Sequence, residues 1–293
     1  MNTEQTPTNR DYSTISPSAK SVLLLKGYTD IPYARAVAEL ISLPEAFQPD
    51  FDKKDFTFWA RVLHFDIRYR SINQLLAGLE MKNVLELSSG FSFRGLVAVQ
   101  DSDVHYIDTD LPGIITAKKE LTEQLRDKNA IPKGKLEILP VNALDEAQVK
   151  EVIGHFEPGA VAIVNEGLLM YLETEEKRIL CGIIRDILKE RGGYWITADI
   201  YKKTVHSAID VQIDDKLQDF FAKHRVEEKM FDSFEAAEAF FKSEGFVIDK
   251  EAEPEYAQSG ALQHVLASAE EEQLANMGKM GKIHATWRLK LAE

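Results

Sequence analysis

Between residues 83 and 198, short apolar segments alternate with longer amphipathic ones, and this alternation most constrains the fold. The apolar segments predict five strands, at residues 83–87, 104–108, 135–139, 160–165 and 194–198. The segments between them predict helices, at residues 91–100, 111–129, 145–153 and 173–190. Apolar strands that alternate with helices are typical of a parallel sheet covered by helices on both faces. We therefore predict a doubly wound α/β domain.

Both flanks of this region follow other patterns. Residues 1–18 are polar and predict a loosely attached tail, and residues 18–79 have helical spacing without a convincing strand. After the fifth strand, we predict a helix at 233–244, a strand at 246–249, a surface excursion at 251–282 and a final antiparallel strand at 284–291. We therefore place a domain boundary after residue 80. Residues 1–80 form a tail and helical region, and residues 81–293 form a sheet domain.

Composition excludes several classes of protein. Lys and Arg total 35 against 48 Asp and Glu, for a net charge of −13, which argues against a nucleic-acid partner. Cys181 is the one cysteine, so an internal disulfide and a cysteine-based metal site are excluded, and we expect no metal. No apolar run approaches the roughly 18 residues of a membrane span, and residues 1–18 do not resemble a secretion signal. We predict a cytoplasmic protein with no membrane partner, of open oligomeric state.

Ligands of doubly wound sheets bind outside the carboxyl ends of the strands, where the strand order reverses. The rule directs attention to the residues that follow the strands, at 88–90, 108–110, 142–144 and 165–167. Ser88-Ser89-Gly90 is a turn of small residues that enters a helix, and small residues let a ligand approach the backbone. Any turn from strand to helix favours Ser and Gly, so this turn alone is a weak signal.

An acidic residue at the end of the second strand is a sharper signal. Asp110 lies 20 residues after Gly90, where a carboxylate can accept hydrogen bonds from ribose hydroxyls. We assign Asp110 to ribose and Asp108 to a structural role, while the alternative is that one of them only caps the next helix. The cofactor is then a nicotinamide dinucleotide or S-adenosylmethionine. The turn lacks the G-x-G-x-x-G spacing that a pyrophosphate needs, which favours the methyl donor.

Four stretches give the chain a specific resemblance. They are NVLELSSGFSFRGL at residues 83–96, YIDTDLPGII at 106–115, NEGLLMYL at 165–172 and IRYRSI at 67–72. In these stretches the sequence resembles the leucine carboxyl methyltransferase family, which includes O-methyltransferases of polyketide biosynthesis. The resemblance extends over about residues 18–250 and the terminal strand. It implies a Rossmann-like class I methyltransferase sheet, mostly parallel with an antiparallel last strand, and an N-terminal helical lid.

The resemblance also implies a set of residues that bind S-adenosylmethionine. Lys20 and Arg68 would hold the carboxylate of its methionine moiety, with Arg70 as the alternative to Arg68, and Glu166 would face the amino group. The family usually has Gly-Ala-Gly where this chain has Ser88-Ser89-Gly90. The remaining implied contacts are the backbone of Ser88 and Gly90 to the methionine part, Asp110 to the ribose, and Asn142, Ala143 and Leu144 to the adenine.

The function that follows is an S-adenosylmethionine-dependent O-methyltransferase that acts on a carboxylate or hydroxyl of a small molecule. A carboxylate needs no base, whereas a hydroxyl benefits from one. The candidate bases are Asp199, Tyr201, His206, His64 and His264, and none has a partner that the sequence identifies. Three alternatives stay open: a protein C-terminal carboxyl methyltransferase, a methyltransferase-like protein that binds without catalysis, and a nicotinamide dehydrogenase.

Overall fold

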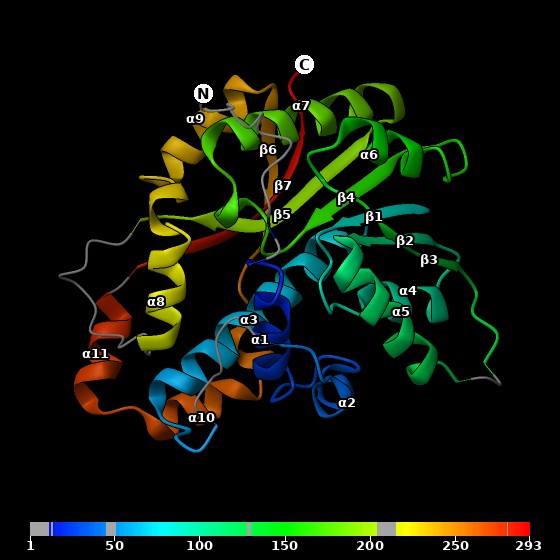
Figure 1. Cartoon of the computed structure of the whole chain (residues 1–293). Coiled ribbons are helices and arrows are strands. Elements are labelled where there is room, and N and C mark those ends of the chain that lie inside the picture. Colours follow the sequence, from blue (N-terminus) through cyan, green and yellow to red (C-terminus); the bar gives the residue numbers. More distant parts are fainter. Residues whose placement is uncertain (1–11, 13, 45–50, 128–129, 204–214, 280) are drawn as a thin grey trace, which may run out of the picture.

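A seven-stranded sheet organises the chain (Figure 1). The computed structural model describes residues 12, 14–44, 51–127, 130–203, 215–279 and 281–293. Most of the predicted tail and the candidate base His206 lie outside these residues. The strands are β1 (Asn83–Leu87), β2 (His105–Asp110), β3 (Lys135–Pro140), β4 (Val161–Asn165), β5 (Gly193–Tyr201), β6 (Phe246–Glu251) and β7 (His284–Leu291).

The strand order is β3-β2-β1-β4-β5-β7-β6. The five strands of the alternating region pair in parallel, whereas β7 is antiparallel to both β5 and β6. The predicted sheet, including its antiparallel last strand, is confirmed. The order reverses between β1 and β4, which places the topological switch point at the carboxyl ends of these two strands.

Helices cover both faces of the sheet (Figure 1). One face carries α6 (Glu146–Ile153), α7 (Thr174–Arg191) and α9 (Phe234–Ser243). The other carries α3 (Phe56–Leu76), α4 (Arg94–Asp101) and α5 (Pro112–Leu125). Each of these amphipathic helices packs its apolar face on the sheet, and the helices thereby supply the two sides of the core, as the sequence pattern predicts.

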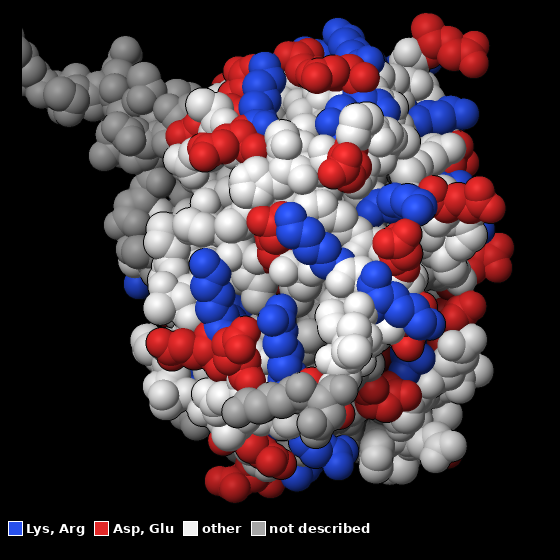
Figure 2. All heavy atoms as spheres, turned by 90° about the vertical axis from the view of Figure 1, so that its right-hand side faces the viewer, with Lys and Arg blue, Asp and Glu red and all other residues white. Residues whose placement is uncertain are grey.

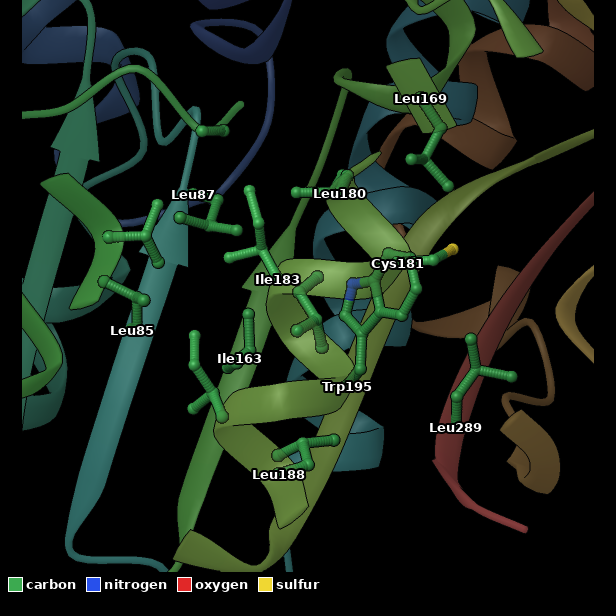
Figure 3. Packing of buried hydrophobic residues seen from close by; sticks show 14 of the residues in the cluster. Leu85, Leu87, Ile163, Leu169, Leu180, Cys181, Ile183, Leu188, Trp195 and Leu289 are labelled. Carbon is green, nitrogen blue, oxygen red and sulfur yellow. The ribbon is translucent and has the colours of Figure 1, made fainter. Parts of the chain in front are cut away.

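The core under α7 shows how this arrangement is held (Figure 3). Leu180 and Cys181 of α7 lie over Ile163 of β4 and Trp195 of β5, and all four are fully buried. The indole N–H of Trp195 donates to Asn165 Oδ1 at 2.7 Å, so its one polar atom is satisfied. This hydrogen bond joins β4 to β5 next to the end of β4, where the candidate site begins.

The helical layer beside the sheet combines both ends of the chain. It contains α1 (Ser18–Lys26), α2 (Ala34–Leu40), α3 and, from the C-terminal part, α10 (Ala261–Ser268). Ala261 and Val265 are buried against Phe58 and Val62 of α3. The prediction of a surface excursion was therefore wrong for α10, because two small apolar residues four positions apart are a weak signal. The described residues also form α8 (Asp215–Lys223), α11 (Glu271–Lys279) and short 3-10 turns at Leu169–Tyr171, Glu227–Lys229 and Tyr256–Gln258.

The charges on the surface are mixed. On the face that Figure 2 shows, Lys and Arg side chains lie among Asp and Glu side chains, and the described residues of this face form no continuous basic stripe. A nucleic-acid backbone requires such a stripe. None of the described helices combines the length and the apolar character needed to cross a bilayer.

Gly95 tests how tightly α4 packs on the sheet. A Cβ at Gly95 would lie 2.6 Å from Tyr106 Cδ1 and 2.9 Å from Leu136 Cδ1. Overpacking of roughly 1–3 kcal/mol exceeds the ~0.5–1 kcal/mol by which Ala is favoured over Gly in a helix. We therefore expect Gly95→Ala to lower the free energy of unfolding by about 1–2 kcal/mol, measured by urea denaturation.

The matched control is Gly182→Ala in α7. The nearest atom that its Cβ would meet is Arg185 Nη2 at 3.9 Å, an ordinary contact. The free energy of unfolding should rise by about 0.5–1 kcal/mol. Equal effects of the two substitutions would contradict the close packing of α4 on β2 and β3.

Candidate active site

A cavity of about 1930 Å³ opens at the carboxyl ends of the parallel strands. The segments that follow β1 to β4 contribute to its wall: Ser88 to Gly90, Asp110, residues 141–144 and Glu166 with Gly167 and Leu168. Tyr201 adds the end of β5, and α1 and α3 close the opposite side through Lys26, His64 and Arg68. Because small-ligand pockets span roughly 300–1000 Å³, this cavity has room for a cofactor together with a second ligand.

The turn after β1 is fixed by hydrogen bonds from its backbone. Ser88 and Gly90 both have left-handed conformations, with φ of 52° and 49°. The Ser89 N–H donates to the Thr109 carbonyl at 2.8 Å, and the Gly90 N–H donates to Asp110 Oδ2 at 2.8 Å. The turn is thereby held against the end of β2, with Ser88 and Gly90 on the cavity wall.

Asp110, the last residue of β2, accepts one hydrogen bond from this turn and one from the residue that follows it. Its Oδ1 accepts from the Leu111 N–H at 2.7 Å, while Oδ2 accepts from Gly90. Burial raises the pKa of Asp110, and the two backbone hydrogen bonds oppose that rise. A carboxylate has about four acceptor positions, so two are left for hydroxyl groups in the cavity.

Asp108 has the structural role predicted for it. Its carboxylate lies 2.9 Å from the ammonium of Lys118, which also donates to Ser89 Oγ at 2.9 Å. Both members of the pair are buried, and burial raises the pKa of Asp108 to about 6 in spite of the Lys118 charge. Since Asp108 does not line the cavity, the pair supports the turn from behind.

The loop after β3 is closed by Asn142. Its Oδ1 accepts from the Leu144 N–H at 3.0 Å, and its own N–H donates to Gln148 Oε1 at 3.0 Å. Asn142, Ala143 and Leu144 all line the cavity, with Ala143 and Leu144 buried. The three residues assigned to adenine by resemblance therefore lie together on one wall.

Glu166, directly after β4, is surrounded by cations. Its Oε1 lies 2.6 Å from Lys26 Nζ and 3.4 Å from Arg68 Nη2, and its Oε2 lies 3.7 Å from Arg94 Nη2. Burial raises the pKa of Glu166, but the three cations outweigh burial and lower it to about 2. The carboxylate is consequently ionised at any pH near neutrality.

Asp199, one of the candidate bases, holds the loop that carries Glu166. Its carboxylate accepts from the N–H groups of Gly167, Leu168 and Leu169, at 2.6, 2.7 and 3.0 Å. It also accepts from Asn165 Nδ2 at 2.7 Å. With four hydrogen bonds already made, Asp199 positions the loop.

The structure places Lys26, not Lys20, beside Glu166. The Lys20 ammonium donates to the Leu43 carbonyl, and Lys20 is not among the cavity-lining residues. Lys26 lies in the last turn of α1, where sequence reasoning reads a cation as a partner of the helix dipole and overlooks it. Arg70 also lies away from the cavity wall, and its guanidinium pairs with Asp66 and Asp30.

Two buried atoms in this cluster have unused hydrogen-bonding capacity. Among the described residues, Arg68 Nε and Glu166 Oε2 have no hydrogen-bond partner, although both side chains are less than a tenth exposed. Buried polar atoms in native proteins are almost always satisfied. Arg68 Nε and Glu166 Oε2 therefore keep one donor and one acceptor position that the described protein atoms do not use.

Tyr201 connects Arg68 to a histidine. Its hydroxyl lies 3.0 Å from Arg68 Nη1 and 2.8 Å from His64 Nε2. Tyr201 and His64 are both candidate bases from the sequence. Because they lie 137 positions apart, no local sequence pattern predicts their contact. His264 instead stacks on Trp59, with ring centroids 4.0 Å apart, and does not line the cavity.

The fold has relatives among solved structures. No protein-family model and no curated protein matches the sequence. A DUF574 family protein from Streptomyces avermitilis is similar over 94% of this chain and 97% of its own, with a TM-score of 0.53 and 14% identity. A magnesium protoporphyrin IX methyltransferase from Synechocystis, crystallised with bound S-adenosylmethionine, matches 93% of this chain and 97% of its own, with a TM-score of 0.48 and 9% identity. The strand order, with β7 antiparallel between β5 and β6, is that of a Rossmann-like class I methyltransferase sheet, and the Streptomyces protein is similar in fold over nearly the whole of both chains.

Proposed function

We propose that this chain is an S-adenosylmethionine-dependent O-methyltransferase that acts on a carboxylate or hydroxyl of a small molecule. The observation that carries the proposal is the contact of Glu166 with Lys26 and Arg68 at the switch point of the sheet. The methionine end of the cofactor is a zwitterion. A carboxylate between two cations is the complement of its ammonium and carboxylate groups.

Binding exchanges one set of ion pairs for another. The cofactor carboxylate takes Arg68 and Lys26 as partners, and its ammonium takes Glu166, including the open Oε2. Each buried charge keeps an opposite charge throughout, which avoids the cost of an unpaired buried ion. Lys26 takes the role that the resemblance gave to Lys20, and Arg68 and Glu166 keep theirs.

The rest of the cofactor follows the wall of the cavity. Ser88 and Gly90 border the methionine part, Asp110 accepts the ribose hydroxyls, and Asn142 with Ala143 frames the adenine. The turn after β1 also disfavours a dinucleotide, because Ser88-Ser89-Gly90 lacks the G-x-G-x-x-G spacing that a pyrophosphate needs.

The chemistry requires little beyond positioning. S-adenosylmethionine, when bound, supplies a methyl group that is already activated. The protein aligns the acceptor and excludes water, which α1 and α3 do by closing the cavity over the sheet edge.

The resemblance to the leucine carboxyl methyltransferase family supports this function. Within that family we favour a small-molecule acceptor over a protein C-terminus, because a cavity of about 1930 Å³ has room for a compact ligand beside the cofactor. A location in the cytoplasm stays a prediction from the sequence.

Calorimetric titration with S-adenosylhomocysteine tests the cofactor site. We expect micromolar binding, equal to about −8 kcal/mol, and no comparable binding of a nicotinamide dinucleotide. Glu166→Gln should weaken the S-adenosylhomocysteine affinity about tenfold to a hundredfold, because it replaces a charge-assisted hydrogen bond to the ammonium by a neutral one.

The matched control is Glu244→Gln. Glu244 is a mostly buried carboxylate that pairs with Arg178 at 2.6 Å and does not line the cavity. Its substitution should leave the affinity unchanged. Absence of S-adenosylhomocysteine binding by folded wild-type protein would refute the proposed function and leave a methyltransferase-like scaffold.

The low pKa of Glu166 predicts that the stability of the fold depends on pH. The pKa of Glu166 is about 2 in the folded protein against 4.5 for a free side chain, so its ionisation stabilises the fold above pH 4.5 and that stability is lost as pH falls toward 2. At pH 7 the contribution is about 3 kcal/mol. Urea denaturation should therefore show a difference between wild type and Glu166→Gln that shrinks to about half by pH 3. A difference that does not change with pH would contradict the low pKa.

A further inference from the structure

Beyond the cofactor wall, the cavity has a second polar region. It consists of His64 on α3, Tyr201 at the end of β5, and His284 and Thr286 on β7, and we call these four residues the polar floor. Tyr201 and His284 are paired in the register of β5 and β7, and Thr286 points to the same face two residues later. Thr286 Oγ1 is buried and, among the described residues, has no hydrogen-bond partner.

Arg68 fixes the direction of one hydrogen bond of the polar floor. It can only donate, so the Tyr201 oxygen accepts from Arg68 Nη1. In the His64 tautomer that carries its proton on Nδ1, the Tyr201 hydroxyl donates to His64 Nε2. The Tyr201 oxygen then keeps one lone pair for a ligand.

The polar floor is uncharged near neutral pH. Burial, aided by His284 and Arg68, lowers the pKa of His64 well below 6.5, and burial lowers that of His284 to about 3. Burial keeps Tyr201 protonated by raising its pKa. The other charges that face His64 are Lys26 and Glu166, which neutralise each other, and Arg68, which Asp199 balances.

The walls around the polar floor are mostly apolar. They include aromatic and aliphatic side chains from α3, α8, α10 and two turns, namely Phe65, Phe221, Leu262, Met230 and Tyr256, with charged side chains such as Arg61, Lys202 and Lys282 also on the cavity wall. Arg68, the cation that contacts Tyr201, is already paired with Glu166 and Asp199, so a carboxylate placed on this floor would lose its hydration and compete with them for that cation. A neutral hydroxyl on an aromatic ring matches both the floor and the walls.

We propose that the methyl acceptor is a neutral aromatic hydroxyl compound, that Tyr201 receives its hydroxyl, and that His64 takes up the proton. This inference rests on the proposed function, which it deepens by naming the acceptor class and the residues that serve it. Tyr201 touches the reacting oxygen, and His64 acts through Tyr201.

The step balances without another reactant. The acceptor oxygen forms a bond to the methyl carbon while the bond from sulfur to carbon breaks, and the electron pair of that bond stays on sulfur. The acceptor proton passes to the Tyr201 oxygen as the Tyr201 proton passes to His64 Nε2. The products are a methyl ether, S-adenosylhomocysteine and an imidazolium at His64.

The change in charge during methyl transfer favours passage of the proton to His64 in the same step. The positive charge of the sulfonium disappears as the imidazolium forms, so the number of positive charges in the site is constant. Before the transfer, the sulfonium opposes protonation of His64, and afterwards that opposition is gone. Loss of the sulfonium charge therefore removes one of the effects that disfavour protonation of His64, while burial, His284 and Arg68 continue to lower its pKa.

A binding experiment tests the acceptor class without turnover. Protein saturated with S-adenosylhomocysteine is titrated with 2-naphthol and, separately, with 2-naphthoate, which have the same ring system. We expect 2-naphthol to bind at least tenfold more tightly, and Tyr201→Phe to weaken its binding several-fold without affecting 2-naphthoate. Equal or tighter binding of 2-naphthoate, or no binding of 2-naphthol, would overturn the proposal.

A second experiment separates His64 as proton acceptor from His64 as packing. With 2-naphthol and S-adenosylmethionine as substrates, His64→Phe should lower kcat at least tenfold and change KM less than threefold, because the ring volume is kept and the acceptor nitrogen is lost. The matched control His264→Phe keeps the stack on Trp59 outside the cavity and should leave both constants unchanged. An unchanged kcat in His64→Phe, or a change confined to KM, would remove His64 from the mechanism.

The two proposals fail in different ways. Loss of S-adenosylhomocysteine binding in wild-type protein counts against the cofactor site. Normal S-adenosylhomocysteine binding together with preference for 2-naphthoate counts against the polar floor as a hydroxyl site and leaves the cofactor site intact.

Discussion

The buried Glu166 carboxylate, with Lys26, Arg68 and Arg94 around it, is the interaction on which the rest of the site depends. A carboxylate of this kind cannot stay ionised in the interior without cations, and each of these cations comes from a different helix. The cluster thereby joins α1, α3 and α4 to the end of β4. Docking of α1 and α3 on the sheet therefore also completes the candidate cofactor site.

Other buried carboxylates extend the same principle along the sheet edge. Asp199 accepts three backbone N–H groups of the loop after β4, and Asp110 accepts two at the turns after β1 and β2. Asp108 supports the first turn through Lys118 and Ser89. The loops at the switch point are therefore held by fixed negative charges on strands, which is how a rigid sheet positions a site built on loops.

The sequence predicts the sheet well because strand and helix periodicity are local signals, and the residues after each strand follow from the topology. Asp110 was assigned from its position after the second strand, and Arg68 and Glu166 from the family resemblance. The structure brings all three to one cavity. The contact between His64 and Tyr201 and the contact of Lys26 with Glu166 are long-range, and no local pattern encodes them. The packing of α10 on α3 was missed for the same reason.

A crystal structure of the complex with S-adenosylhomocysteine tests the central claim most directly. The account predicts that the ligand carboxylate contacts Arg68, that its amino group contacts Glu166, and that the contact of Lys26 with Glu166 lengthens beyond the present 2.6 Å. A complex in which the ligand binds elsewhere, while Lys26, Arg68 and Glu166 keep their present contacts, would contradict the account.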